Sequence, residues 1–391
     1  DALPILRVMN KALGPIGVFG ASNFPLAFST AGGDTASALA AGCPVVFKGH
    51  AAHPGTSEVV AKAIEAAVAK TGMPKGVFSL IHGGTRKVGQ ALVAHPLIKA
   101  VGFTGSTGGG RALFDIAVSR PEPIPFYGEL GSNNPVFLLP KAMGEKATEI
   151  AKGWVGSLTM GVGQFCTNPG LLIAVKGADL DAFVDKAASE LGQVDGAAML
   201  TDRVSSAYHD VTDAMSKHGK VTCALKRRDS DGKFEGSPAI FRTTAADWKA
   251  NPELAEEMFG PAGIIVECDT VDEMIALSAT LIGQLTATVH MVDGDSDVAG
   301  KLRPALEKCA GRILINGWPT GVEVCHSMVH GGPYPASTDS RSTSVGSLAI
   351  KRFIRPVSYQ AFPDALLPAA IQDANPLNIP RLVNGKWQMP G

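Results

Sequence analysis

The sequence lacks the patterns that define zinc-binding and disulfide-rich proteins. None of its six cysteines forms a Cys-x-x-Cys pair, and no cluster of cysteines and histidines has zinc-ligand spacing, so we expect no metal site. Six cysteines scattered over 391 residues are also too few for a disulfide scaffold. We therefore expect reduced thiols and a cytoplasmic protein.

Excess charge and long apolar runs are absent as well. The 35 basic and 36 acidic side chains nearly cancel, which gives no reason to expect binding to nucleic acid or to an anionic membrane. No apolar run reaches about 18 residues, so no transmembrane helix is predicted, and no signal peptide is recognisable. Because the chain begins with Asp1 and enters an apolar segment almost at once, we expect further sequence ahead of it.

Short apolar segments that alternate with helical patterns are abundant. The 45 glycines and 26 prolines are spread along the chain, as in an α/β protein with many tight turns. The first third predicts buried strands at residues 14–21, 44–50, 76–83 and 99–106. The intervening segments predict helices at residues 29–42, 55–72 and 85–96. This alternation predicts a parallel, doubly wound sheet, which binds ligands at the carboxyl ends of its strands.

A second α/β unit is predicted to begin near Gly131. Its strands are expected at residues 134–139, 170–177, 285–292 and 311–318, and a strand followed by a helix is expected over 262–281. Further helices are predicted at residues 146–161 and 179–192. Residues 348–362 alternate β-forming and basic side chains, which predicts an extended tail that docks on another subunit.

Three side chains in the loops between these elements are candidates for chemistry. Cys166, in GVGQFCTNPG, is either a small core residue or, if it is accessible as a thiolate, a nucleophile. Glu129, in YGELGSNNP, is either a solvated surface acid or a general base. Asn23, in SNFP, either caps a turn or donates to a developing oxyanion. The residue types alone leave both possibilities open at each position.

Six segments together resemble the NAD(P)-dependent aldehyde dehydrogenase superfamily. Between residues 21 and 261 the chain contains, in the order of that family, ASNFP, FKGH, GFTGST, GELGSNNP, GQFCTNPG and EEMFGP. The resemblance runs from about Gly14 to the end of the chain. Three further segments resemble the branch of α-ketoglutaric semialdehyde (2,5-dioxopentanoate) dehydrogenases, in which bacterial long-chain fatty aldehyde dehydrogenases are near relatives: HAAHPGTSE, NGWPTGVEVCHSMVHGGPYPAS and NPLNIPRLVNGKW.

The resemblance implies a role for each candidate. Cys166 matches the catalytic thiol that attacks the aldehyde carbon, and the Asn23 side chain and the Cys166 backbone N–H would hold the oxyanion. Glu129 matches the general base that activates water to hydrolyse the thioester. Glu257 and Phe259, in EEMFGP, match the residues that hold the nicotinamide ribose and ring.

The substrate site is less sharply indicated. Phe24, Phe165 and Thr167 flank the catalytic motifs and are expected to line it. A substrate with a carboxylate would need an arginine or several polar donors at the mouth of the site, for which the neighbouring sequence offers Arg312, Thr320 and Ser327. A fatty aldehyde would instead need an apolar tunnel.

The expected cofactor is a nicotinamide dinucleotide. No G-x-G-x-x-G pattern follows the first strand, as is normal in the family that the chain resembles. Instead, Gly105 and Ser106, in GFTGSTGGG, open a helix after a strand, and such a helix N-terminus can bind a pyrophosphate.

The choice between NADP and NAD depends on the loops after two strands. NAD-preferring members often carry a Glu three residues after the lysine that Lys48 matches, and here that position is Ala51. Arg86 lies in the next strand-to-helix loop, where a guanidinium could bind a phosphate, and Lys87 or His50 could share this role. We therefore favour NADP, with NAD as the alternative.

The resemblance also implies an architecture. We expect an aldehyde dehydrogenase-like α/β fold with a Rossmann-type parallel sheet in a cofactor-binding domain over residues 1–130 and an α/β catalytic domain over 131–345. Residues 346–391 would form an oligomerisation strand and tail, with residues 1–13 as part of that strand, in a homodimer or homotetramer. An amino-terminal part of the family fold is expected to be absent from this chain.

Four functions remain open. The leading one is NADP-dependent oxidation of 2,5-dioxopentanoate to 2-oxoglutarate, and the first alternative is oxidation of a long-chain fatty aldehyde. A relative that transfers the acyl group to CoA is disfavoured by the retained Glu129, because hydrolysis needs a base and acyl transfer to CoA does not. A truncated, inactive protein with a structural or binding role is the alternative outside enzymology, and intact Cys166, Glu129 and Asn23 argue against it.

Overall fold

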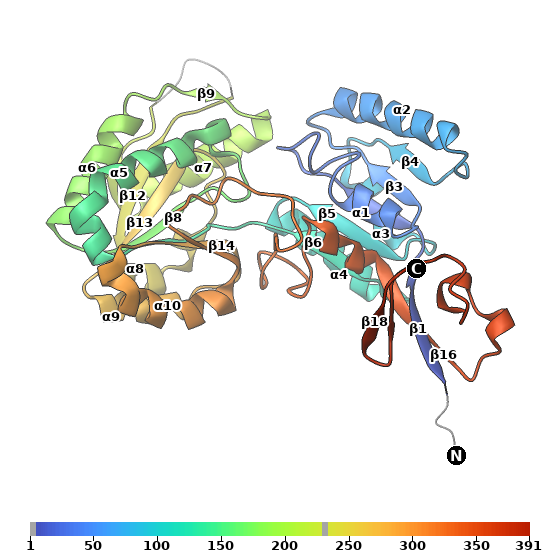
Figure 1. Cartoon of the computed structure of the whole chain (residues 1–391). Coiled ribbons are helices and arrows are strands. Elements are labelled where there is room, and N and C mark those ends of the chain that lie inside the picture. The colour runs from blue at the N-terminus through green and yellow to red at the C-terminus, as the bar shows by residue number, and fades with distance from the viewer. Residues whose placement is uncertain (1–4, 229–233) are drawn as a thin grey trace.

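The first third of the chain forms a five-stranded parallel sheet (Figure 1). The computed structural model describes residues 5–228 and 234–391. The strands of this sheet, in spatial order, are β4 (Phe78–Ile81), β3 (Val45–Lys48), β2 (Ile16–Phe19), β5 (Ala100–Thr104) and β6 (Phe126–Glu129). The helices that connect them are α1 (Asp34–Ala40), α2 (Pro54–Lys70), α3 (Arg86–Ala94) and α4 (Thr107–Ser119). The strand order reverses between β2 and β5, which is where a doubly wound sheet binds its ligand.

Both faces of this sheet are covered, as its apolar strands require. All four side chains of β2 are buried. On one face Val45 and Phe47 pack in a cluster with Ala61 of α2, and on the other Val101 packs in a cluster with Leu92 of α3. The sheet is therefore rigid enough to position the loops at its carboxyl edge.

A seven-stranded sheet forms the second body, and only its edge strand β10 runs antiparallel to its neighbour. Its strands, in spatial order, are β10 (Thr222–Leu225), β12 (Ala239–Thr244), β13 (Ala262–Cys268), β8 (Leu171–Val175), β7 (Val136–Leu138), β14 (Gln284–His290) and β15 (Ala310–Ile315). Its helices are α5 (Pro140–Thr159), α6 (Ala178–Leu191), α7 (Asp202–Lys217), α8 (Ala245–Ala250), α9 (Val271–Ser278) and α10 (Ser296–Cys309). A short ladder joins β9 (Ala197–Ala198) to β11 (Glu235–Gly236).

After β15 the chain returns to the five-stranded sheet (Figure 1). Residues 316–346 contain no helix or extended strand. The Leu130 backbone N–H donates to the Ala336 carbonyl at 2.8 Å, and Glu129 and Ser337 form an isolated antiparallel bridge. This return segment, residues 316–346, places Ala336 and Ser337 against the end of β6.

The tail leaves the two bodies as a ribbon. β16 (Ile354–Gln360) pairs antiparallel with β1 (Leu6–Ala12), and Figure 1 shows this ribbon projecting from the side of the five-stranded sheet. A small hairpin of β17 (Arg381–Val383) and β18 (Lys386–Gln388) follows. In the described part of the chain, no helix is long and apolar enough to cross a membrane.

The predicted α/β class with parallel sheets is confirmed, and several boundaries differ from expectation. The helix predicted at residues 29–42 begins only at Asp34, because Gly32 and Gly33 turn the chain tightly; a Cβ at Gly32 would lie 2.0 Å from the Ala27 carbonyl oxygen. The fifth strand, β6, follows a proline-rich stretch and was not predicted, nor were α7, α10 and β12. The domain limits at 130/131 and 345/346 stay a prediction.

Candidate active site

Cys166 follows a turn with unusual backbone geometry at the end of α5. Gly161, Val162 and Gly163 all have positive φ, at 56°, 58° and 67°. This left-handed region is strained for a β-branched residue such as Val162. No larger residue fits at Gly163, since a Cβ there would lie 2.2 Å from the Gly260 backbone. The glycines therefore allow the sharp bend that leads into Cys166.

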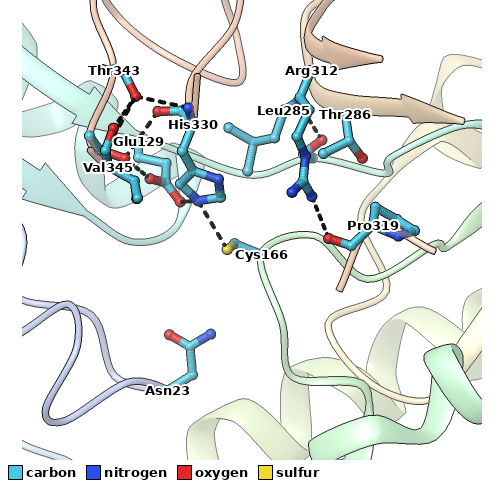
Figure 2. Close-up of polar contacts among 12 residues, drawn as sticks. Asn23, Glu129, Cys166, Leu285, Thr286, Arg312, Pro319, His330, Thr343 and Val345 are labelled. Carbon is cyan, nitrogen blue, oxygen red and sulfur yellow. Dashed lines mark hydrogen bonds and ion pairs between the residues drawn. The ribbon is translucent and has the colours of Figure 1, made fainter. Parts of the chain in front are cut away.

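The Cys166 thiol lies beside a buried histidine and a buried carboxylate (Figure 2). Its Sγ is 3.5 Å from Nε2 of His330, and the same Nε2 is 2.9 Å from Oε1 of Glu129. The Ser344 hydroxyl donates to Oε2 of Glu129 at 2.7 Å. Only 1% of the His330 side chain and 4% of the Glu129 side chain are exposed, so the contact is shielded from water.

Three separate parts of the fold hold this triad. Glu129 ends β6, Cys166 follows α5, and His330 lies in the return segment. The His330 backbone N–H donates to the Thr343 hydroxyl at 2.9 Å, and the ring of Phe28 stacks on the imidazole with centroids 5.9 Å apart. These contacts fix the orientation of the imidazole.

The backbone of Cys166 is held by one buried amide. The Asn134 side chain donates to the Cys166 carbonyl and to the Asn168 carbonyl, each at 2.9 Å. Asn134 is fully buried between β6 and β7. The loop that carries the thiol is therefore tied to the junction of the two sheets.

The charges of the triad are coupled. Burial favours the neutral carboxyl of Glu129, but the His330 cation and the hydrogen bonds from His330, Ser344 and Cys166 hold its pKa below the usual value. Burial favours neutral His330, but Glu129 raises the pKa of His330 well above its usual value. Burial and then Glu129 raise the pKa of the Cys166 thiol, which His330 partly offsets. Near neutral pH the site is thus an imidazolium–carboxylate pair beside a thiol.

His330 is the residue that sequence reasoning missed. It lies in VHGGPYP, far from both partners along the chain, and no local spacing connects it to them. The only signal was a histidine in a glycine-rich loop, which by itself does not indicate a site.

Asn23 approaches the thiol from the opposite side to His330 (Figure 2). Its Nδ2 donates to the Gln164 carbonyl at 2.9 Å, which leaves the second N–H of the amide free. In the described residues, no carbonyl takes the backbone N–H of Cys166. The two groups that the sequence predicted for an oxyanion both retain a donor, and their role stays a prediction.

Two of the three predicted substrate residues belong to an aromatic cluster near the thiol. The rings of Phe24 and Phe165 meet edge to face with centroids 5.1 Å apart, and Phe24 also contacts Phe28 at 5.5 Å. Thr167 is 1% exposed, and its hydroxyl has no hydrogen-bond partner among the described residues. The structure thus brings Phe24 and Phe165 together and places Thr167 in the interior.

The three polar residues that could bind a substrate carboxylate lie in different environments. Arg312 of β15 lies near Cys166 (Figure 2). Thr320 is buried, with its hydroxyl 3.2 Å from the hydroxyl of Ser157. Ser327 lies in an exposed stretch next to Cys325, with 3.5 Å between Oγ and Sγ. Of the three, Arg312 is the one that Figure 2 shows beside the thiol, and a substrate role for any of them stays a prediction.

The predicted pyrophosphate loop has the expected form at the start of α4. Ser106 is the N-cap of α4, and its hydroxyl accepts from the Gly109 N–H at 3.4 Å. The Gly105 N–H donates to the Glu129 carbonyl at 3.1 Å, so it is not free for a phosphate. The exposed first turn of α4 is left as the anion-binding element.

The residues expected to select NADP share one edge of the five-stranded sheet. Lys48 ends β3, and Arg86 is the first residue of α3 after the neighbouring strand β4. Ala51 is exposed in the turn after β3. Burial lowers the pKa of Lys48, and burial together with His53, Lys48 and Arg203 lowers the pKa of His50 to about 4. Near neutral pH His50 is therefore uncharged, and Lys48 and Arg86 are the cations of this edge.

Glu257 faces a space in which a cofactor could be held. A Cβ at Gly131 would lie 2.5 Å from Glu257 Oε2, so only glycine leaves this carboxylate its place. Glu257 and Phe259 line one hollow with Phe165. Burial raises the pKa of Glu257 to about 7, against a hydrogen bond from the Ser132 backbone. Among the described residues no cation pairs with this half-buried carboxylate, which fits a partner that donates hydroxyl groups, such as a ribose.

Comparisons with known proteins agree with this geometry. The sequence model of the aldehyde dehydrogenase family matches residues 5–348 of this chain. The chain is 53% identical over 381 residues to alpha-ketoglutaric semialdehyde dehydrogenase 2 of Azospirillum brasilense, covering 97% of this chain and 73% of that protein. It is 46% identical over 385 residues to the alpha-ketoglutaric semialdehyde dehydrogenase of Acinetobacter baylyi, covering 97% and 72%. The fold also matches a solved glyceraldehyde-3-phosphate dehydrogenase of Methanocaldococcus jannaschii complexed with NADP, with TM-score 0.77, 19% identity, and 92% and 75% coverage.

Proposed function

Because this chain belongs to the aldehyde dehydrogenase family, we propose that it oxidises 2,5-dioxopentanoate to 2-oxoglutarate with NADP in the cytoplasm. The observation that carries the reaction class is the buried contact of Cys166 with His330 and Glu129. The substrate is inferred from relatives that are 46% and 53% identical over 97% of the chain. All six cysteines are free, as the cytoplasm requires.

The protein's own groups account for the covalent steps. Transfer of the thiol proton to water leaves a Cys166 thiolate beside the His330 cation, and attack of this thiolate on the aldehyde carbon forms a thiohemiacetal. The free N–H groups of Asn23 and Cys166 would stabilise the oxyanion. After oxidation, Glu129 would accept a proton from the water that hydrolyses the thioester, since its depressed pKa keeps it ionised. Hydrolysis releases the carboxylic acid and restores the thiol.

Two groups of residues fit the ribose and the 2′-phosphate of NADP. The unpaired carboxylate of Glu257 would accept hydrogen bonds from a ribose, and Lys48 and Arg86 would meet a 2′-phosphate. When bound, NADP supplies the hydride acceptor that takes the thiohemiacetal to the thioester. Ser106 would place the first turn of α4 at the pyrophosphate.

Ala51→Glu tests the choice of cofactor. A carboxylate in this turn would repel a 2′-phosphate and accept hydrogen bonds from ribose hydroxyls. We expect kcat/KM for NADP to fall by about tenfold or more, with kcat/KM for NAD unchanged or higher. Initial rates with each cofactor measure this, and Ala66→Glu on the exposed face of α2 adds the same charge as a control. Equal loss with both cofactors would contradict the assignment.

A substrate panel tests the function as a whole. Initial rates are measured with 2,5-dioxopentanoate, succinic semialdehyde and a long-chain aldehyde, each with NADP and with NAD. We expect the highest kcat/KM for 2,5-dioxopentanoate with NADP, and no stimulation by CoA. A preference for the long-chain aldehyde would support the fatty aldehyde alternative, and inactivity on all three would support a structural or binding role.

We also propose that the chain forms a homodimer or a homotetramer. The ribbon of β1 and β16 exposes Leu6 and Val8, which supports the role of the tail in a homodimer or homotetramer. Apart from the small-molecule aldehyde, the near-neutral charge supports neither a nucleic-acid nor a membrane partner.

A further inference from the structure

Arg312 projects from the edge strand of the second sheet toward the reactive thiol. It lies on β15 opposite Thr286 of β14, and Figure 2 shows its guanidinium between that strand and the loop that carries Cys166. The charges of Arg312 and Cys166 interact, since a thiolate at Cys166 raises the pKa of Arg312 against the effect of burial. The proposed reaction does not use this cation.

Backbone carbonyls hold the guanidinium in place. Its Nη1 donates to the Gly321 carbonyl at 2.7 Å, and its Nη2 donates to the Pro319 carbonyl at 2.5 Å. Its Nε is buried and has no partner among the described residues. An arginine has five N–H donors, so three of them remain for a ligand, in the fork that suits a carboxylate.

No acid in the described part of the chain neutralises this cation. Within residues 5–228 and 234–391, no carboxylate lies within ion-pair distance of Arg312. Carbonyl dipoles orient the guanidinium but leave its net charge, and a partly desolvated charge without a counter-ion is costly. The more deeply buried Arg352 is paired with Asp34 at 2.5 Å, whereas the buried Arg120 is held by the Val93 and Ile98 carbonyls and lies away from the thiol. The cation beside the thiol is therefore arranged for an anion that is supplied from outside.

We propose that Arg312 is the specificity-determining residue that binds the distal carboxylate of the aldehyde substrate. This inference rests on the proposed function and narrows it to short aldehydes that carry a carboxylate at the other end. The carboxylate would accept from Nε and one Nη while the aldehyde carbon meets the Cys166 thiol. An unpaired cation at this position also disfavours an apolar fatty chain.

The turnover experiment compares charged and neutral substrates of equal carbon count. Wild type, Arg312→Met and the control Arg303→Met, at an exposed position of α10, are assayed with 2,5-dioxopentanoate and with pentanal. We expect Arg312→Met to raise KM for 2,5-dioxopentanoate by about 10- to 100-fold with little change in kcat. KM for pentanal should not rise, and Arg303→Met should match wild type. An unchanged ratio of the two KM values would overturn the proposal.

A second experiment needs no turnover. Glutarate has two carboxylates at the same chain length, and its binding at Arg312 would cover Cys166. We expect glutarate to slow alkylation of Cys166 by iodoacetamide in wild type and in Arg303→Met, but not in Arg312→Met. The exposed Cys325 serves as the internal reference for mass spectrometry.

These two readouts separate the inference from the function on which it rests. If wild type oxidises no aldehyde while glutarate protects Cys166 through Arg312, the proposed function fails and the anion site stands. If 2,5-dioxopentanoate is oxidised and Arg312→Met changes neither KM nor protection, the inference fails alone. Arg312→Lys, which keeps the charge and loses the fork, replaces Arg312→Met if the latter does not fold, and an intermediate loss is expected.

Discussion

Replacement of Cys166 by alanine is expected to abolish aldehyde-dependent NADPH formation. In the described part of the chain, the thiol and the Glu129 carboxylate are the two groups in contact with Nε2 of His330, and no covalent intermediate can form without the thiol. Loss of a nucleophile from a catalytic group that acts as a unit lowers kcat by about 10⁴-fold or more. Initial rates of absorbance at 340 nm, with excess enzyme for the variant, measure the loss.

Two controls make this result specific. Cys325→Ala removes an exposed thiol and should keep wild-type activity. The melting temperature of Cys166→Ala should stay close to that of wild type, because its neighbours Asn134 and Asn23 bond to backbone atoms and not to the thiol. Near-normal activity in Cys166→Ala would exclude the covalent mechanism.

Replacement of His330 by glutamine should produce the second-largest loss. The imidazole contacts both the Cys166 thiol and the Glu129 carboxylate, and its charge stabilises the thiolate. We expect kcat/KM near neutral pH to fall by about 10²-fold or more, in the range of positioned acid–base groups. Steady-state assays over a pH series measure it.

The pH dependence gives this variant a signature that a purely structural effect would not produce. Burial and Glu129 raise the pKa of Cys166, and the His330 cation lowers it. Because Glu129 holds the pKa of His330 well above its usual value, the cation is present near neutral pH in wild type. Its removal therefore raises the pKa of the thiol further, so the pH at which iodoacetamide alkylates Cys166 at half its maximal rate should move upward.

A neighbouring histidine provides the matched control. His326→Gln changes an exposed side chain that bonds to Ser347 and should leave both the activity and the alkylation profile unchanged. If His330→Gln lowered activity without moving the alkylation profile, the imidazole would have a packing role against Phe28 instead of an electrostatic one.

The type of each element could be predicted from the sequence where its apolar residues form a local pattern. The apolar runs at β2, β3 and β5 and the pattern of α2 are local properties, so the parallel α/β class could be predicted. β6 was missed because its four residues, with Glu129 at their end, form a strand only by pairing with β5. Short strands of this kind depend on their neighbours more than on their own composition.

The candidate nucleophile also followed from sequence, because it lies in a compact motif. GVGQFCTNPG contains both the thiol and the glycines that allow its left-handed turn, and its order relative to Glu129 and Asn23 is a property of the chain alone. The sequence thus carried the fold class, the family and the candidate for the attacking atom.

The neighbours of the Cys166 thiol were revealed only by the tertiary structure. His330 reaches Cys166 because the return segment pairs with the end of β6, and Arg312 reaches it because β15 lies beside β14. In both pairs the residues are more than a hundred positions apart, where sequence spacing has no bearing on distance. Local patterns specify which atoms can react, whereas the packing of the two sheets sets the protonation of the thiol and the charge that its substrate meets.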